Sequence, residues 1–268
     1  MSKLYIVGTP IGNLEDITLR ALRVLKEVDV IASEDTRHTR ILLDRYDIRK
    51  PLISYYKQKE NEGSDKICDL IAEGKNVALV TDAGMPAISD PGAVLVRKVR
   101  EKGLEAEVVP GPTAVCSAVA LAGLTGRGFC FLGFLPEKKK DRDRLLDSVK
   151  DIDVPLAFYV APHDMESTTA YLYEKLGRRR VYACKELTKL HETVYAGYLG
   201  ELSIEDPRGE FVLITDEKDS PDTPDMAAMV AEVDELVADG TSKKDALKII
   251  ADKYSVSKNL LYNAYHLK

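Results

Sequence analysis

The sequence predicts an α/β protein of two domains, with a mostly parallel N-terminal sheet, a mixed C-terminal sheet and a small helical C-terminal appendix. Strand-like runs alternate with amphipathic helices over about residues 1–125, whereas four strand-like runs between 154 and 215 have one long helical stretch among them. The length of 268 residues fits two ordinary domains at about 150 residues each. We expect the boundaries to separate residues 1–130, 131–220 and 221–268.

The N-terminal region alternates short runs of Val, Ile and Tyr with apolar residues spaced three and four apart, the patterns of strands and helices. Ile17, Ala21 and Val24 illustrate the helical spacing, and the apolar run 76–81 is typical of a strand inside a parallel sheet. The expected order is strand 3–8, a helix through 17–28, strand 29–33, a helix around 41–43, strand 76–81, helix 92–102, strand 107–109 and helix 112–122.

The second domain is expected to begin near residues 131–136, where the N-terminal pattern ends. Residues 216–225 are acidic and contain two prolines, a composition typical of linkers. Beyond them, helices are broken at Gly240, and the last segment resembles a helix-turn-helix with its turn at 254–255. The expected elements are strand 154–160, helix 166–176, strands 181–187, 193–198 and 210–215, and helices 226–239 and 241–268.

Composition excludes disordered and membrane-spanning classes. Hydrophobic residues make up 45% of the chain and charged residues 31%, and no apolar run approaches the ~20 residues that cross a bilayer. We therefore expect a cytoplasmic protein without a membrane partner. The four cysteines are far apart and have no histidine at ligand spacing, so we expect buried free thiols and no metal.

Although the net charge of the chain is −6, basic side chains are clustered in two short segments. Residues 200–239 hold 13 acidic and two basic side chains, which accounts for the acidic balance. Elsewhere, the run 138–144 has five bases and two acids, and residues 178–180 are three arginines. Such clusters suit a phosphate backbone, although taken by itself each of them is better explained as a solvated helix face or loop.

Four loops follow the expected N-terminal strands, where ligands bind in open α/β sheets. Residues 8–13 lack both the GxGxxG spacing and the GK[ST] ending, so a dinucleotide or P-loop site is excluded and a tight turn is the alternative. Residues 33–38 place two carboxylates beside Arg37 and His38. One of these residues could cap the following helix, or a carboxylate could act as a general base.

The other two loops favour ligand binding more strongly. Residues 81–92 form a long turn that is rich in glycine and proline and contains two acidic residues. Ordering such a turn costs backbone entropy, which makes a purely structural role less favoured than ligand binding. Residues 110–114 place a turn at a helix N-terminus, where free N–H groups bind carboxylate or ribose oxygens.

Seven motifs occur in order along the chain, namely GTPIGNLED (8–16), SEDTR (33–37), TDAGMP with SDPG (81–92), PGPTA (110–114), GFLP (133–136), KELTK (185–189) and RGEFV (208–212). With these motifs the chain resembles, across residues 3–268, the tetrapyrrole methylase family and, within it, the ribosomal RNA small-subunit methyltransferase I group. Cys184 stands where the group's Arg-Glu-Leu pattern has arginine, which leaves open which basic side chain serves there.

The resemblance implies two α/β domains that hold S-adenosylmethionine between them, usually in a homodimer. It implies methylation of a cytidine ribose 2′-hydroxyl in small-subunit (16S) ribosomal RNA, with free RNA or the 30S subunit as the partner. Pro10 is expected to close the cofactor site on the side of the methyl group that is transferred. The implied cofactor contacts are Pro10, Asp82, Gly84, Ser89, Pro110, Gly111, Pro112, Thr113 and Ala114, with main-chain groups of Ala161 and Glu210.

The candidates for the base that removes the hydroxyl proton are Glu34, Asp35 and Glu186, in that order. Glu186 is alternatively a buried partner of Lys185 or Arg37. The segment 133–136 and the basic run after it are expected to be a mobile loop that orders on RNA. The side chains expected to meet RNA are Arg37, Arg40, Lys138, Lys139, Lys140, Arg142, Lys189 and, from the C-terminal helices, Lys258.

Two other functions remain open. A methyltransferase of the same fold could act on a corrin or porphyrin precursor, but the basic run and residues 240–268 would then be superfluous. A non-catalytic RNA-binding assembly factor would retain the fold without binding the cofactor. The C-terminal helices could equally serve dimer contacts or packing.

Overall fold

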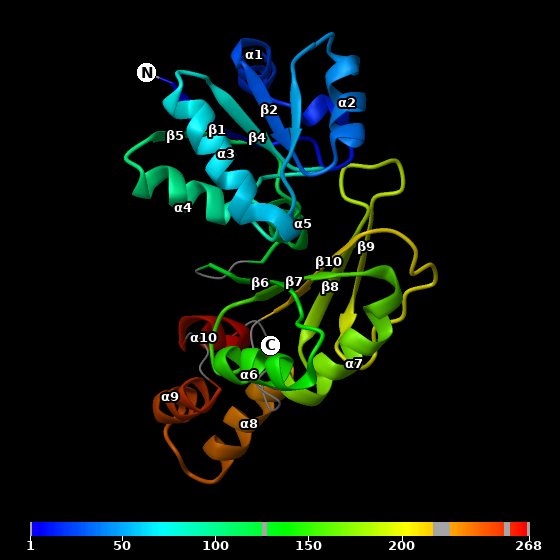
Figure 1. Ribbon diagram of the computed structural model, residues 1–268. Coiled ribbons are helices and arrows are strands. Elements are labelled where there is room, and N and C mark those ends of the chain that lie inside the picture. The colour runs from blue at the N-terminus through cyan, green and yellow to red at the C-terminus, as the bar shows by residue number, and fades with distance from the viewer. Residues whose placement is uncertain (1, 125–127, 217–225, 255–257, 267–268) are drawn as a thin grey trace. The chain divides into compact units, whose positions relative to one another are not determined.

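A computed structural model describes residues 2–124, 128–216, 226–254 and 258–266, and the chain divides into two compact units, Met1–Glu217 and Lys218–Lys268. Within the described residues, the first unit holds two five-stranded sheets with their helices (Figure 1). The second unit is helical. The fold class predicted from the sequence, with a parallel sheet, a mixed sheet and a helical C-terminal part, is confirmed.

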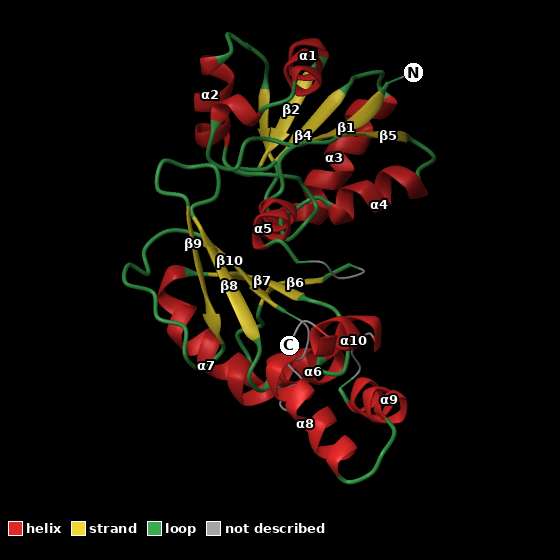
Figure 2. Ribbon diagram, turned by 180° about the vertical axis from the view of Figure 1, so that it is seen from behind, coloured by secondary structure: helices red, strands yellow, loops and turns green. Residues whose placement is uncertain are grey.

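The first sheet is entirely parallel, in the order β3-β2-β4-β1-β5. Helices α1 and α2 pack on one face and α3 and α4 on the other (Figure 2). The elements are β1 Lys3–Val7, α1 Leu19–Glu27, β2 Val30–Ser33, α2 Thr36–Arg45, β3 Leu52–Ser54, α3 Glu60–Ala72, β4 Val77–Val80, α4 Ala93–Glu101 and β5 Glu105–Val109, with short 3₁₀ turns at Leu14–Asp16 and Lys57–Lys59.

The burial pattern explains this layering. All four residues of β4 are buried because helices cover both faces of the strand. Neighbouring strands β1 and β4 are followed by α1 and α4, which lie on opposite faces of the sheet. The loops after these two strands therefore lie at the carboxyl ends of the sheet, the usual ligand position in open α/β sheets.

The second sheet is mixed, in the order β6-β7-β10-β8-β9, and only β6 and β7 pair in parallel. Helices α6 and α7 cover one face, and α5 covers the other. The elements are α5 Ala114–Ala122, β6 Cys130–Phe134, α6 Lys139–Val149, β7 Leu156–Val160, α7 Met165–Leu176, β8 Arg180–Lys185, β9 Thr193–Tyr198 and β10 Phe211–Thr215, with a 3₁₀ turn at Pro162–Asp164.

Helix α5 follows the first sheet in sequence but packs on the second. Ala118 is fully buried there, and its carbonyl lies 3.9 Å from the Cys184 thiol. The small side chains of α5 allow this close approach, as their composition predicts. The prediction that all four cysteines are buried is wrong for Cys116, which is exposed on the same helix because it faces away from the sheet, and Cys130 is only partly buried.

Four elements were not predicted, namely β3, α3, β6 and α6. The mobile loop expected over the basic run is wrong, because residues 139–149 form α6. Leu146 and Val149 bury against the second sheet, and the Asp143 carboxylate accepts a hydrogen bond from Tyr171 at 2.6 Å and pairs with Lys175 at 2.6 Å. These contacts hold the basic run in a helix.

The second unit forms three helices in the described residues, α8 Met226–Ala238, α9 Lys243–Lys253 and α10 Lys258–His266, which pack around Val233, Leu247 and Leu261. The break predicted at Gly240 is confirmed, with a φ of +94° that favours glycine. Most of the linker expected over 216–225 and part of the turn at 254–255 lie outside the described residues. Among the helices described, none is both long and apolar enough to cross a bilayer.

The packing of α5 predicts different costs for two leucine substitutions on this helix. Ala118→Leu inserts three carbons into the buried contact with the second sheet and should lower the free energy of unfolding by about 1–3 kcal/mol. Ala120→Leu, at an exposed position of the same helix, should change it by less than about 0.5 kcal/mol. Urea denaturation measures both, and equal effects would contradict the packing of α5.

Candidate functional site

Three loops of the first sheet are joined where β1, β4 and β5 end. Thr9 and Gly84 exchange two backbone hydrogen bonds, with N···O distances of 2.9 and 3.1 Å. The backbones of Gly8 and Gly111 approach so closely that a Cβ on Gly111 would lie 2.9 Å from the Gly8 Cα. Glycine is required at this crossing because real Cβ atoms do not approach backbone so closely. The three loops thus form one continuous wall.

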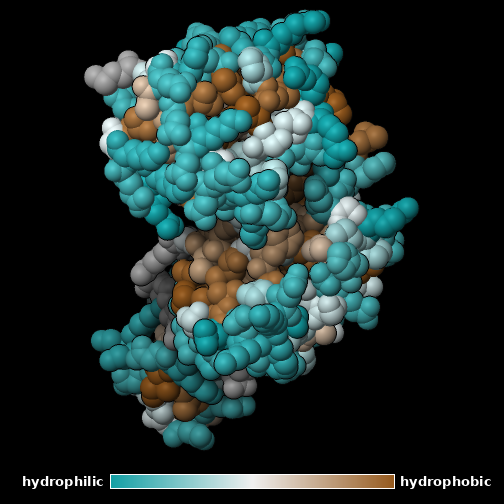
Figure 3. Space-filling view, viewed as in Figure 1, coloured by the Kyte–Doolittle hydropathy of each residue, from teal (hydrophilic) through white to brown (hydrophobic). Residues whose placement is uncertain are grey.

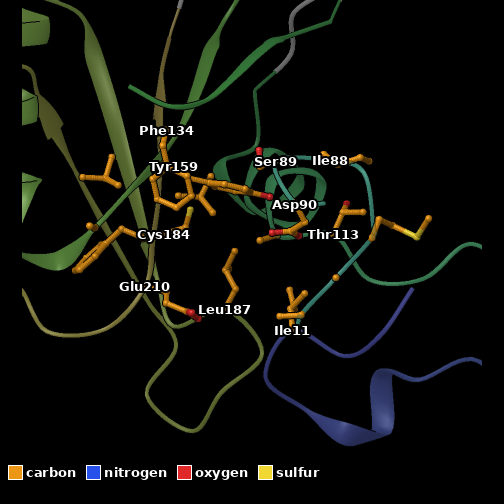
Figure 4. A pocket seen from close by; sticks show the side chains of 18 of the residues that line it. Ile11, Ile88, Ser89, Asp90, Thr113, Phe134, Tyr159, Cys184, Leu187 and Glu210 are labelled. Carbon is orange, nitrogen blue, oxygen red and sulfur yellow. The ribbon is translucent and has the colours of Figure 1, made fainter. Parts of the chain in front are cut away.

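A cavity of about 330 Å³, here named the first cavity, lies between this wall and the second sheet. Its size is within the ~300–1,000 Å³ of small-molecule and cofactor sites. Ile11, Ile88 and Thr113 face it from the wall, and Tyr159 and Leu187 face it from the second sheet (Figure 4). Apolar side chains gather in the hollow between the two sheets (Figure 3).

Polar groups occur at a few points of the first cavity. Burial, and then the neighbouring charge of Glu34, raise the pKa of the Asp90 carboxyl to about 6. At the N-terminus of α5, the Thr113 side chain makes no capping hydrogen bond, so the first N–H groups of the helix are left for other acceptors. Glu210, the residue directly before β10, adds a carboxylate, and its side chain is 76% exposed.

A second cavity of about 300 Å³ adjoins the first. Ile11, Ala83 and Glu210 line both, so these residues form the boundary between the two spaces. The rest of the second cavity is lined by α2 and by the loops after β1, β4 and β8, and includes Thr9, Pro10, Gly12, His38, Thr39, Ile41, Asp82 and Lys189.

The parallel register brings the acidic loops after β2 and β4 together. Ser33 pairs with Val80, so the residues that follow meet, and the Thr81 hydroxyl donates to Glu34 Oε2 at 3.0 Å. The Asp35 N–H donates to Asp82 Oδ1 at 3.2 Å. This edge of the sheet therefore concentrates carboxylates beside both cavities.

Asp35 is engaged within its own helix. Its carboxylate caps α2 by accepting the Arg37 N–H at 2.8 Å and pairs with the Arg37 guanidinium at 2.7 Å. The side-chain hydrogen bond from Arg37 holds the pKa of Asp35 well below its usual range. The helix-cap alternative considered for residues 33–38 is therefore the observed arrangement.

Glu186 is held in the loop after β8. Its Oε1 accepts the Glu210 N–H at 2.8 Å and the Lys189 ammonium at 3.0 Å, and its φ is +50°. Burial opposes ionisation, but these hydrogen bonds outweigh it, so the pKa of Glu186 lies below its ordinary value. Two residues before Glu186, at the position where the family pattern has arginine, burial raises the pKa of the Cys184 thiol to about 11. The adjacent Lys185 is paired with Asp206 at 3.0 Å.

The predicted cofactor residues divide between the two cavities. Pro10 and Asp82 line the second cavity, whereas Pro110, Gly111 and Pro112 belong to the turn behind the first. Glu34, Asp35 and Glu186 lie beside the cavities and line neither. Those that line the first cavity are Gly84, Ser89, Thr113, Ala114, Ala161 and Glu210.

The predicted RNA-contacting residues lie at several places on the surface. Arg37 is 90% exposed, and Arg142 stacks over the Tyr171 ring at 5.0 Å. Lys189 lines the second cavity, and Lys258 is exposed at the start of α10 in the other unit. The remaining members, Arg40, Lys138, Lys139 and Lys140, are exposed on α2, at the N-cap of α6 and in its first turn.

Sequence reasoning missed most of the apolar lining. Asp90 and Phe134 stood within quoted motifs, so the motifs themselves could have pointed to them. Leu187 also stood within a quoted motif, whereas Tyr159 carried no such signal, because which strand residues face the cavity depends on how α5 and the second sheet pack.

The family follows from comparison with known proteins. Residues 3–203 match the family model described as Tetrapyrrole (Corrin/Porphyrin) Methylases. The chain belongs to the tetrapyrrole methylase family. Among solved structures of this fold, the crystal structure of diphthine synthase superimposes with a TM-score of 0.66 at 15% identity, over 81% of this chain and 90% of that one.

Curated relatives of this tetrapyrrole methylase carry one name. "Ribosomal RNA small subunit methyltransferase I" from Thermotoga maritima is 46% identical over 223 residues, 82% of this chain and 100% of the relative. The protein of the same name from Bacillus subtilis is 38% identical over 278 residues, 100% of this chain and 95% of the relative.

The raised pKa of Asp90 predicts how stability depends on pH. Between about pH 4, near its unperturbed value of 3.8, and about pH 6, the folded protein binds this proton and the unfolded chain does not. Stability from this group therefore falls as the pH rises through that window. Asp90→Asn should remove about 2 kcal/mol of this decline in the free energy of unfolding.

Urea denaturation at several pH values measures the effect. Asp151→Asn, at an exposed position, serves as the control and should leave the pH dependence unchanged. An unaltered decline in Asp90→Asn would contradict the environment described for this carboxyl.

Proposed function

We propose that the protein is an S-adenosylmethionine-dependent methyltransferase that methylates a cytidine 2′-hydroxyl in small-subunit (16S) ribosomal RNA. The observation that carries this proposal is the pair of adjoining cavities, one of cofactor size and mostly apolar, the other lined by both polar and apolar side chains. The name shared by the curated relatives supports ribosomal RNA as the substrate class.

The first cavity fits S-adenosylmethionine. Its apolar walls suit an adenine ring, and carboxylates of Asp90 and Glu210 favour a cationic ligand. The uncapped N-terminus of α5 offers N–H donors to hydroxyl or carboxylate oxygens. Bound there, the cofactor would supply a methyl group on a cationic sulfur. The residues proposed to hold it are Pro10, Asp82, Gly84, Ser89, Pro110, Gly111, Pro112, Thr113, Ala114, Ala161 and Glu210.

Methyl transfer to a hydroxyl needs alignment and removal of a proton. Holding two reactants in line can supply ~7–11 kcal/mol of the barrier, and a positioned base adds ~10²–10⁴ in rate. Among the candidates Glu34, Asp35 and Glu186, the lowered pKa values of the last two make them weak bases. Glu34 is therefore favoured among these three.

RNA is proposed to meet exposed cations around the cavities. Lys138 and Lys140 flank the first turn of α6, where the described residues show no ion pair to either side chain, and Arg142 stacks on Tyr171 next to them. Cations beside an aromatic ring suit phosphates and unstacked bases. The other proposed contacts are Arg37, Arg40, Lys139, Lys189 and Lys258.

Three further features are part of the proposal. The resemblance to the family supports a homodimer and a cytoplasmic location. We place domain boundaries so that residues 1–130 form the first α/β domain, 131–220 the second and 221–268 the helical region. The described residues contain no group of three or more His, Cys, Asp or Glu side chains that could hold a metal ion.

Transfer of a tritiated methyl group tests the function directly. The protein is incubated with labelled S-adenosylmethionine and, separately, 30S subunits, naked 16S RNA or a porphyrin precursor. We expect label in RNA, released by nuclease digestion as 2′-O-methylcytidine. Label in the porphyrin precursor alone would contradict the proposed substrate, and cofactor binding without any transfer would contradict the proposed activity.

Charge reversal on α6 tests the RNA surface. Lys138→Glu with Lys140→Glu should lower the slope of log affinity for RNA against log salt by about 1–2, because two phosphate contacts are lost. The affinity for S-adenosylmethionine in calorimetry should be unchanged. Lys26→Glu with Lys75→Glu, exposed positions of equal charge change, is the control. Equal loss in both double variants would contradict a localised RNA surface.

A further inference from the structure

The second cavity contains a histidine beside a carboxylate. His38 lies in the first turn of α2, and its Nδ1 is 4.0 Å from Asp82 Oδ2. The other oxygen, Asp82 Oδ1, accepts the Asp35 N–H at 3.2 Å. The backbone thus fixes one oxygen of the carboxylate and leaves the other facing the imidazole. The imidazole itself is 64% exposed, so solvent or a ligand can reach it.

Two other polar side chains of this cavity, Lys189 and Thr9, are already engaged. Lys189 pairs with Glu186 at 3.0 Å and with Glu210 at 2.7 Å. The Thr9 hydroxyl donates to the Thr81 carbonyl at 3.1 Å. Among the described lining residues, the His38 Nε2 has no hydrogen-bond partner and is therefore available as a proton acceptor.

The second cavity is also placed and shaped for a nucleotide. It meets the first cavity at Ile11, Ala83 and Glu210, so a hydroxyl at this boundary would face a methyl donor in the first cavity. Ile41 lines the second cavity and is 70% exposed, which offers an apolar surface to an unstacked base. Enzymes that modify polynucleotides commonly hold an extruded nucleotide against such side chains.

We propose that His38, oriented by Asp82, accepts the proton of the ribose hydroxyl that is methylated. The proposal rests on the proposed function and assigns the base to His38 in place of Glu34. As the hydroxyl O–H bond breaks, the proton moves to His38 Nε2, and an oxygen electron pair forms the bond to the methyl carbon. The carbon–sulfur bond breaks with its electron pair on sulfur, which becomes neutral. The Asp82 carboxylate stabilises the imidazolium that results.

The charges around His38 suit this role. Asp82 faces it from the loop after β4, and Glu210 and Lys189, which pairs with both Glu186 and Glu210, face the cavity from the side of the second sheet. On its own helix, Asp35 and Arg37 form a pair. A histidine with one carboxylate behind it is the arrangement that general bases commonly use.

Replacement of His38 tests the proposal. In His38→Asn and His38→Gln, we expect kcat for 30S or 16S RNA to fall by ~10²–10⁴-fold. The KM for RNA should change less than threefold, and the calorimetric Kd for S-adenosylmethionine should stay within twofold of the unmodified value. The acidic limb of the kcat–pH profile should disappear. His191→Asn, in the exposed loop after β8, is the matched control and should behave as the unmodified protein.

Two further variants distinguish His38 from other bases. Asp82→Asn should lower kcat, because the imidazolium loses the carboxylate beside it, whereas Glu34→Gln should retain the acidic limb. A kcat of His38→Asn within threefold of the unmodified protein, or loss of the limb in Glu34→Gln instead, would overturn the proposal while leaving the methyltransferase function intact. Failure of the unmodified protein to methylate RNA would overturn both.

Discussion

The close backbone crossing of Gly8 and Gly111 is the constraint on which the site depends. With the two hydrogen bonds between Thr9 and Gly84, it draws the ends of β1, β4 and β5 into one wall. Side chains at the crossing would force these loops apart, because a Cβ on Gly8 would lie 2.7 Å from the Gly111 Cα. The wall in turn faces the second sheet and encloses the first cavity.

Carboxylates gather at this wall, and several cations are exposed on the surface around it. Carboxylates of Glu34, Asp82 and Asp90 gather where the parallel strands end, so that the interior of the site favours a cation. Cations such as Arg37 and Lys138 are exposed outside the cavities, where a polyanion can reach them without entering the acidic interior. Such an arrangement separates the preference for a cationic sulfur donor from the attraction of an RNA backbone.

Sequence patterns predicted the strand ends and most of the loops that line the two cavities, because parallel strands must present their loops at one edge. They failed where tertiary contacts decided the outcome. Helix α3 contains Gly63, which weakens the helical pattern, yet a Cβ there would lie 2.9 Å from the Tyr55 ring. The charged start of α6 concealed Leu146 and Val149, whose burial holds the helix. The apolar side chains of the first cavity, Tyr159 among them, became evident only once α5 was seen to pack on the second sheet.

The central claim is that the first cavity binds the methyl donor and that the second receives the hydroxyl to be methylated. A crystal structure with S-adenosylhomocysteine, the neutral product of the donor, tests this most directly. We expect the product between Thr113 and Tyr159, with its sulfur toward the boundary formed by Ile11 and Ala83. Product bound outside the first cavity, or with its sulfur turned away from the second, would contradict the claim.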